Sequence, residues 1–135
     1  MQTLVTSSHP LILHIAPAGR WAEQRSSGAA GYVDGSLEDE GFIHCSTVDQ
    51  FLLPANSLFR GRTDLLLLVV AAARLSSPLV YEDCYQSGQQ FPHVYGPIDV
   101  AAVVDAVDFP CDDDGSFSEP PGLRDHLARL AAELA

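Results

Sequence analysis

The chain has 135 residues, of which 47% are hydrophobic, and its formal net charge of −11 arises from 18 acidic and 7 basic residues. This length and composition are typical of one domain with its own core, and they argue against disorder of the whole chain. All the basic residues are arginines, so we expect neither a nucleic-acid partner nor an anionic membrane surface.

The N-terminal third predicts a strand, a helix and a loop. Residues 11–16 are an apolar run between two prolines, which is typical of a buried strand. Pro17 suits the first position of a helix, which we expect over residues 18–26. Residues 28–41 contain four glycines and the acidic cluster Glu38-Asp39-Glu40, so a loop is expected there.

A second short strand is expected over residues 42–45, followed directly by a helix. Thr47 and Gln50 have the spacing of a capping box, which predicts that this helix begins at Thr47 and runs to about Phe59. Pro54 would then lie too deep for the first turn, and we expect it to distort the helix.

The C-terminal half predicts extended segments and then a final helix. Residues 64–73 are an aliphatic run and form the clearest buried strand, with a further strand over residues 79–85. The prolines within residues 91–97 favour extended backbone. Residues 103–109 alternate apolar and acidic side chains, as a half-exposed strand does.

The chain ends in a polar linker, residues 110–121, and a helix over residues 122–134 with leucines on one face. Two early helices followed by a series of strands favour an α+β fold over an alternating α/β one. We therefore expect a single domain over residues 1–135, with its core in residues 11–109.

The sequence also bears on the cellular compartment. No apolar stretch approaches the roughly 20 residues of a membrane-spanning helix, and the polar N-terminus does not resemble a secretory signal. Three widely spaced cysteines (Cys45, Cys84 and Cys111) do not form a disulfide pattern. We expect a cytoplasmic protein with reduced thiols.

The turn around His44 is the strongest candidate for chemistry. His44 stands in a predicted strand, and Ser46 and Thr47 follow at the predicted helix start. Hydroxyl donors beside unpaired first-turn N–H groups form a natural anion site. The alternative is structural: Thr47 only caps the helix, and His44 bonds a loop carbonyl.

Four other residues are candidates with equally clear structural alternatives. His14 lies inside an apolar strand, where a lone histidine is often a satisfied core residue. His93 and Tyr95 lie in a segment flanked by proline and glycine, which either lines a cleft or forms a tight connector. Glu82 is strand-borne, and is either a general base or ribose ligand or simply exposed to solvent. No Cys-x2-Cys or His-x3-His pair is present, so no metal centre is predicted.

Two motifs carry a family resemblance. Gly41-Phe42-Ile43-His44 followed by Ser46-Thr47, with Phe91-Pro92-His93-Val94-Tyr95-Gly96 further on, resembles the bacterial family called domain of unknown function 952 over roughly residues 11–109. That family is similar to the ADP-ribosyltransferase fold, in the branch of RNA 2'-phosphotransferase. The resemblance implies a mixed, split β-sheet and a cleft that holds NAD, lined by His14 and His44 with Ser46 beside them.

The leading hypothesis is an ADP-ribosyltransferase-like domain that binds NAD, as a substrate, or a related nucleotide or phosphate ligand. Its chemistry would be ADP-ribosyl transfer or hydrolysis, with His44 and Glu82 as catalytic residues and Glu82 stabilising an oxocarbenium-like transition state. The expected ligand-binding residues are His14, Ser46, Thr47, His93 and Tyr95. The acidic cluster Glu38-Asp39-Glu40 would repel an RNA phosphate.

Two other classes of function stay open. The domain could be a non-catalytic module that binds a small molecule or a protein on the same fold. A cysteine- or metal-dependent enzyme is the third hypothesis. The oligomeric state does not follow from the sequence.

Overall fold

The computed structural model describes residues 9–83 and 86–134. Its strands are β1 (Leu11–Pro17), β2 (Gly31–Tyr32), β3 (Ile43–His44), β4 (Leu65–Ala71), β5 (Leu79–Glu82), β6 (Phe91–Val94), β7 (Ile98–Asp99) and β8 (Val103–Asp108). Its α-helices are α1 (Ala18–Ser26), α2 (Gly35–Glu40), α3 (Leu52–Leu58) and α4 (Leu123–Leu134), with short 3-10 turns at η2 (Ala72–Arg74) and η3 (Val100–Ala102). The expected α+β class is confirmed.

The strands form three antiparallel sheets. The largest has the order β1-β4-β8, the second β3-β6-β5, and β2 pairs with β7. Backbone hydrogen bonds of 2.8 Å in both directions between Leu13 and Ser46 connect β1 to the segment after β3. This bridge places the second sheet beside the first, and it brings the end of β3 close to the middle of β1.

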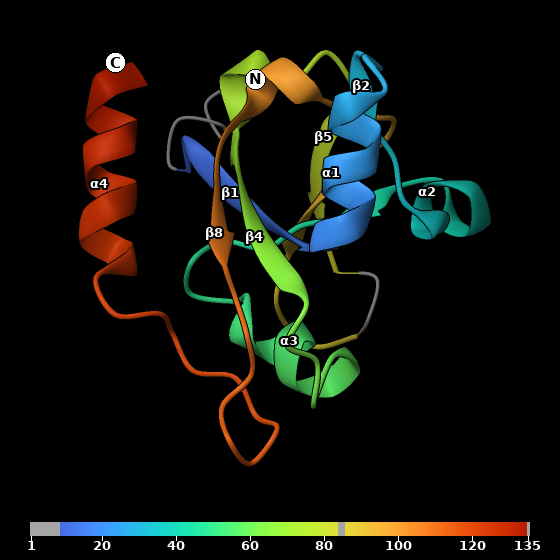
Figure 1. Cartoon of the computed structure of the whole chain (residues 1–135). Coiled ribbons are helices and arrows are strands. Elements are labelled where there is room, and N and C mark those ends of the chain that lie inside the picture. The colour runs from blue at the N-terminus through green and yellow to red at the C-terminus, as the bar shows by residue number, and fades with distance from the viewer. Residues whose placement is uncertain (1–8, 84–85, 135) are drawn as a thin grey trace.

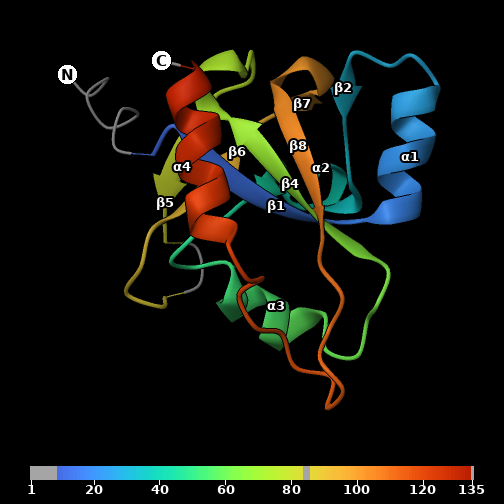
Figure 2. The same ribbon diagram turned by 60° about the vertical axis from the view of Figure 1, so that its left-hand side comes forward.

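The position of β4 at the centre of its sheet explains why its sequence is an unbroken aliphatic run. Both of its faces are covered, and its side chains are divided between two hydrophobic cores. One core contains Trp21 of α1 and Ile43 of β3. The other contains Leu127 of α4 and Phe109, which directly follows β8. Figures 1 and 2 show α1 and α4 on opposite sides of the β1-β4-β8 sheet.

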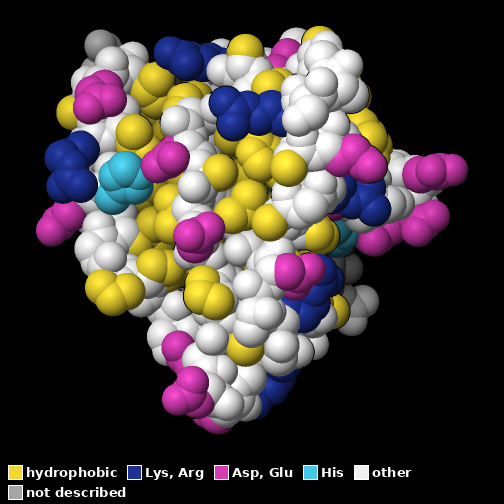
Figure 3. Space-filling model, viewed as in Figure 1, with side chains coloured by type: hydrophobic (Ala, Val, Ile, Leu, Met, Phe, Trp, Pro, Cys, Tyr) yellow, Lys and Arg dark blue, Asp and Glu magenta, His cyan; other side chains and the backbone are white. Residues whose placement is uncertain are grey.

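The β8 edge of the sheet is exposed on the surface between these two helices. Figure 3 shows hydrophobic side chains gathered there, between α4 and α1. The apolar side chains of β8 are half-buried, and the strand ends at the exposed Asp108. Asp105 interrupts the apolar row, and its carboxylate accepts a hydrogen bond from His126 of α4 at 2.5 Å. An acidic side chain on an edge strand discourages pairing with another strand.

Most of the predicted elements are confirmed, some with ends that differ by a residue or two. The helix over residues 18–26 is α1, the aliphatic run is β4, the alternating segment is β8, and the final helix is α4. The strand predicted over residues 79–85 is confirmed as β5 from Leu79 to Glu82, and residues 84–85 lie outside the described residues. In the part of the chain described, no helix combines the length and apolar character needed to cross a membrane.

Two predictions around the candidate site are wrong. Residues 28–41 are not all loop, because they contain β2 and the helix α2. The helix predicted from Thr47 begins only at Leu52, after a turn. Within that turn the Gln50 side chain accepts a hydrogen bond from the Thr47 N–H at 3.1 Å, so the capping contact forms ahead of the helix. Pro54 therefore lies in the first turn of α3, where proline is tolerated.

Candidate functional site

Four of the candidate residues, His44, Glu82, His93 and Tyr95, gather on one face of the β3-β6-β5 sheet. His44 of β3 is paired with His93 of β6, and side chains alternate between the two faces of a strand. Ile43 and Val94 point to the opposite face and are fully buried in the core. The other face carries Phe42, His44, Glu82, His93 and Tyr95, and we call these five residues the histidine face.

Phe42 lies at the centre of the histidine face. Its ring stacks on His93, with centroids 4.1 Å apart and an interplanar angle of 17°. The ring centroids of His44 and Tyr95 lie 4.9 Å and 5.2 Å from that of Phe42. Phe42 is nearly buried, and His93 is completely buried beside it. The aromatic contacts therefore fix the orientation of the histidine rings.

Glu82 receives two hydrogen bonds on one carboxylate oxygen. The Nδ1 of His93 lies 2.9 Å from Oε2, and the Tyr95 hydroxyl donates to the same atom. Because a carboxylate only accepts, the proton of the His93–Glu82 bond lies on Nδ1. The Glu82 side chain is 28% exposed, so this fixed carboxylate can still reach a ligand.

His44 has its own carboxylate partner. Its Nε2 lies 3.2 Å from both carboxylate oxygens of Glu40, the last residue of α2. The side chain of His44 is 34% exposed, and its ring centroid lies 5.4 Å from that of His93. His44 is thus the more accessible of the two paired histidines.

His14 lies behind the histidine face rather than on it. Its side chain is 5% exposed, and its Nδ1 lies 2.6 Å from the backbone carbonyl oxygen of His44. Its Nε2 lies 3.5 Å from Oδ2 of Asp34, and its ring packs against the edge of Tyr32. His14 therefore supports His44 through the backbone of β3.

Burial controls the charge of the histidines. Desolvation lowers the pKa of His14, and the neighbouring Asp34 carboxylate opposes that shift. Desolvation likewise lowers the pKa of His93, against the opposing effect of its hydrogen bond to Glu82. Both imidazoles are therefore favoured in the neutral form.

Ser46 and Thr47 are buried, and their backbone groups are already used. Ser46 pairs with Leu13 through its N–H and its carbonyl, and the Thr47 N–H bonds Gln50. Thr47 lines a separate pocket of about 370 Å³ with His9, Asp49, Gln50, Tyr81, Gln89 and Gln90. Because α3 starts at Leu52, these two residues do not stand at a helix N-terminus.

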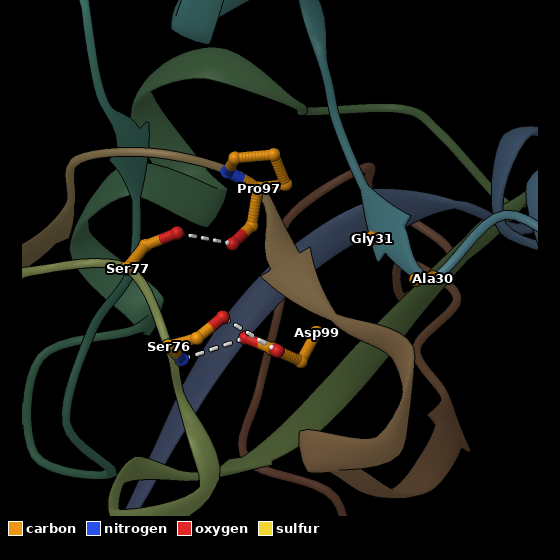
Figure 4. Close-up of a pocket in the computed structure, with 6 residues that line it drawn as sticks. All are labelled: Ala30, Gly31, Ser76, Ser77, Pro97 and Asp99. Carbon is orange, nitrogen blue, oxygen red and sulfur yellow. Dashed lines mark hydrogen bonds between the residues drawn. The ribbon is translucent and has the colours of Figure 1, made fainter.

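A second pocket, of about 280 Å³, lies at the β2-β7 sheet, and its lining is shown in Figure 4. Its polar groups bond one another. Ser76 donates from both its N–H and its hydroxyl to the Asp99 carboxylate, and the Ser77 hydroxyl donates to the Pro97 carbonyl at 2.7 Å. These bonds fasten the segment before β5 to β7. None of the five residues of the histidine face lines this pocket.

The described residues give little support to metal or cysteine chemistry. Among them, no group of three or more His, Cys, Asp or Glu side chains is arranged to hold a metal ion. Cys45 is buried, and desolvation raises the pKa of its thiol, which disfavours the nucleophilic thiolate. Cys84 lies outside the described residues.

Comparison with known protein families places this chain in one of them. The chain belongs to the family described as "Protein of unknown function (DUF952)", which matches residues 15–106. The resemblance stated from the sequence is thereby confirmed for the family. No match is found among curated proteins.

The chain is also similar to solved structures of protein CC0527 from Caulobacter crescentus. Its X-ray crystal structure is 33% identical, with a TM-score of 0.72, over 87% of this chain and 98% of that one. Its solution NMR structure is 34% identical, with a TM-score of 0.67, over 89% of this chain and 98% of that one. These likenesses support the fold and leave the activity to be inferred from the site.

Sequence reasoning missed three residues that shape the site: Asp34, Glu40 and Phe42. Glu40 was seen only as part of an acidic cluster, because α2 was not predicted. With α2 in place, Glu40 stands four residues before His44 with its carboxylate on that ring. Phe42 was part of the family motif, but its stacking on His93 depends on the β3-β6 pairing, which no local pattern reveals.

Proposed function

We propose that this chain binds NAD or a related nucleotide at the histidine face, and that its chemistry is ADP-ribosyl transfer or hydrolysis. The observation that carries this proposal is the Glu82 carboxylate, held by two donors at a partly exposed position on the same face of the sheet as His44. A carboxylate held in this way needs no rearrangement when positive charge develops next to it.

Cleavage at the ribose anomeric carbon develops such a charge. The bond to the leaving group breaks, and the ring carbon and oxygen share the positive charge of an oxocarbenium-like transition state. Glu82 would stabilise that charge. His44 would accept the proton of the incoming hydroxyl or water, whose oxygen bonds the anomeric carbon as nicotinamide leaves. His93 and Tyr95 would hold Glu82, and His14 would hold the backbone of His44.

The charges of the site suggest which part of the ligand lies there. Glu40 and Glu82 are hydrogen-bond acceptors, and a phosphate placed beside them would be repelled. Ribose hydroxyls can donate to these carboxylates, and the cationic nicotinamide ring of NAD would be attracted to them. We therefore place the ribose against the histidine face and the phosphates away from Glu40 and Glu82.

The alternative proposal is a non-catalytic binding module on the same fold. It is favoured by the pairing of His44 with Glu40 and of His93 with Glu82, since such pairs also serve to hold a structure together. In that case the histidine face would bind its ligand without turnover.

Incubation with NAD, with nicotinamide release as the readout, separates these two proposals. Binding of NAD, ADP-ribose and ADP is followed in parallel by amide chemical shifts. Turnover that Glu82→Gln abolishes supports transfer or hydrolysis, whereas binding without turnover supports the module. If all three nucleotides leave the signals of His14, His44 and Ser46 unmoved at millimolar concentration, the nucleotide proposal is wrong. Glu133→Gln, on the exposed face of α4, is the matched control.

A further inference from the structure

The ring of His14 is oriented by an unequal pair of contacts. Its Nδ1 lies 2.6 Å from the His44 carbonyl oxygen, and a carbonyl oxygen only accepts, so Nδ1 must carry a proton. In the neutral imidazole, Nε2 is then an acceptor. This atom is buried and has no hydrogen-bond partner among the described residues, and it lies 3.5 Å from Oδ2 of Asp34, a contact that becomes an ion pair when the imidazole is protonated.

Asp34 is held firmly on its other side. Its Oδ1 accepts hydrogen bonds from the Ser36 N–H at 3.1 Å, the Leu37 N–H at 3.4 Å and the Ser36 hydroxyl at 2.6 Å. These bonds cap the N-terminus of α2, which is a role that aspartate fills well. One carboxylate oxygen therefore belongs to the helix, and the other faces His14.

The far end of α2 returns to the same histidines. Glu40 contacts His44, and the backbone carbonyl of His44 accepts from His14. These contacts form a closed cycle. It runs from Asp34 through α2 to Glu40, then to His44, to His14 and back to Asp34. This cycle of contacts adds to the packing of Leu37, a partly buried residue of α2 that contacts the core, in fixing the position of the helix.

We propose that Asp34 is a positioning residue of the histidine face. It sets the place of α2 relative to β1, and through α2 it sets the Glu40 carboxylate against His44. The inference rests on the proposed function for its relevance to ligand binding. The contacts that carry it involve no ligand.

Several titratable groups lie near this cycle of contacts. Asp34 favours the protonated form of His14, while burial opposes it more strongly. Asp34 also contributes to raising the pKa of Tyr32 and of Cys45, next to the larger effect of burial. At the other end, Glu40 faces both His44 and His93. A change at Asp34 is therefore expected to register first at His14 and then, through α2, at His44.

Two substitutions separate these effects. Asp34→Asn keeps the cap, and its amide can donate to Nε2 of His14, so α2 should stay in place. Asp34→Ser keeps a capping oxygen but is too short to reach His14. Asp39→Asn is the control, because it removes an equal charge from an exposed position on the same helix.

The measurement is the titration of the histidine side-chain NMR signals, from about pH 5 to about pH 8, without ligand. We expect Asp34→Asn to lower the pKa of His14 and to leave the His44 signals unchanged, whereas Asp34→Ser shifts the His44 signals and Asp39→Asn shifts neither. If Asp34→Asn leaves the pKa of His14 unchanged, or Asp34→Ser leaves His44 as in the wild type, the inference is overturned. Should Asp34→Ser fail to fold, Asp34→Gly takes its place, because it also loses the contact with His14 and glycine is well tolerated at an N-cap. A failure of NAD binding would leave these outcomes untouched.

Discussion

The Nδ1 of His93 lies 2.9 Å from Oε2 of Glu82, between the neighbouring strands β5 and β6. His93 is fully buried, whereas Glu82 is partly exposed. The pair therefore connects the interior of the sheet to the surface where a ligand would bind. It also makes the charge of Glu82 measurable through the titration of His93.

Glu82→Gln is expected to lower the pKa of His93. The carboxylate raises that pKa by its hydrogen bond and by its charge, against the larger effect of burial, and the amide removes the charge. The variant should stay folded, because glutamine has nearly the same volume and can still accept from Tyr95. Histidine side-chain NMR signals followed against pH provide the measurement. An unchanged pKa of His93 would show that the pairing with Glu82 is absent in solution.

The stability of the protein should fall as the pH is lowered below about 6.5, the ordinary pKa of an imidazole. Burial lowers the pKa of His14 and His93 in the folded chain, so the unfolded chain binds more protons in this range. The free energy of unfolding then rises with pH, and this contribution is complete above the unfolded pKa and is lost as the pH falls through the folded values. Urea unfolding at a series of pH values tests the slope. His93→Gln should reduce it, and an equal slope in that variant would contradict the assignment.

His14→Leu is expected to destabilise the chain by about 1–3 kcal/mol, because the His44 carbonyl loses the N–H that it accepts from. The leucine side chain is similar in size to the imidazole, so the change in packing within β1 is small. Urea denaturation measures the difference. A free energy of unfolding equal to that of the wild type would mean that the His14–His44 bond contributes nothing to stability.

Gly31→Ala and Gly19→Ala should act in opposite directions. A Cβ at Gly31 would lie 2.6 Å from the Cβ of Pro97, so the β2-β7 pair must shift, and we expect a loss of about 1–3 kcal/mol. A Cβ at Gly19, in α1, would meet no atom within 4 Å, and helix propensity should add about 0.5–1 kcal/mol. Thermal unfolding of both variants tests this contrast. If both behave alike, the close approach of β2 and β7 is wrong.

The elements that could be predicted from sequence are those with local signals. α1 follows Pro17, β4 is a continuous aliphatic run, and α4 carries leucines on one face. α2 gave no such signal, because it is six residues long and buries none of them. Its position depends on the Asp34 cap, on the packing of Leu37 against the core and on the contact of Glu40 with His44, and the last two form only in the folded chain.

The candidate site was predictable in its residues but not in its arrangement. Glu82, His93 and Tyr95 were identified as candidates, yet their shared contact requires the pairing of β5 with β6. The family motif pointed to His44, but the pairing of β3 with β6 is what brings it beside His93. The expected helix start at Thr47 is wrong: the contact between the Thr47 N–H and Gln50 forms within a turn, and α3 begins at Leu52.

The central claim is that the histidine face binds a nucleotide through Glu82. Its most direct test is an NAD titration of the wild type and of Glu82→Gln, observed through the side-chain signals of His44 and His93. We expect both signals to move to saturation in the wild type, and the affinity of the variant to fall by about tenfold or more, as the loss of one charge-assisted hydrogen bond implies. Unmoved signals in the folded wild type, or equal affinity in Glu82→Gln, would contradict the claim.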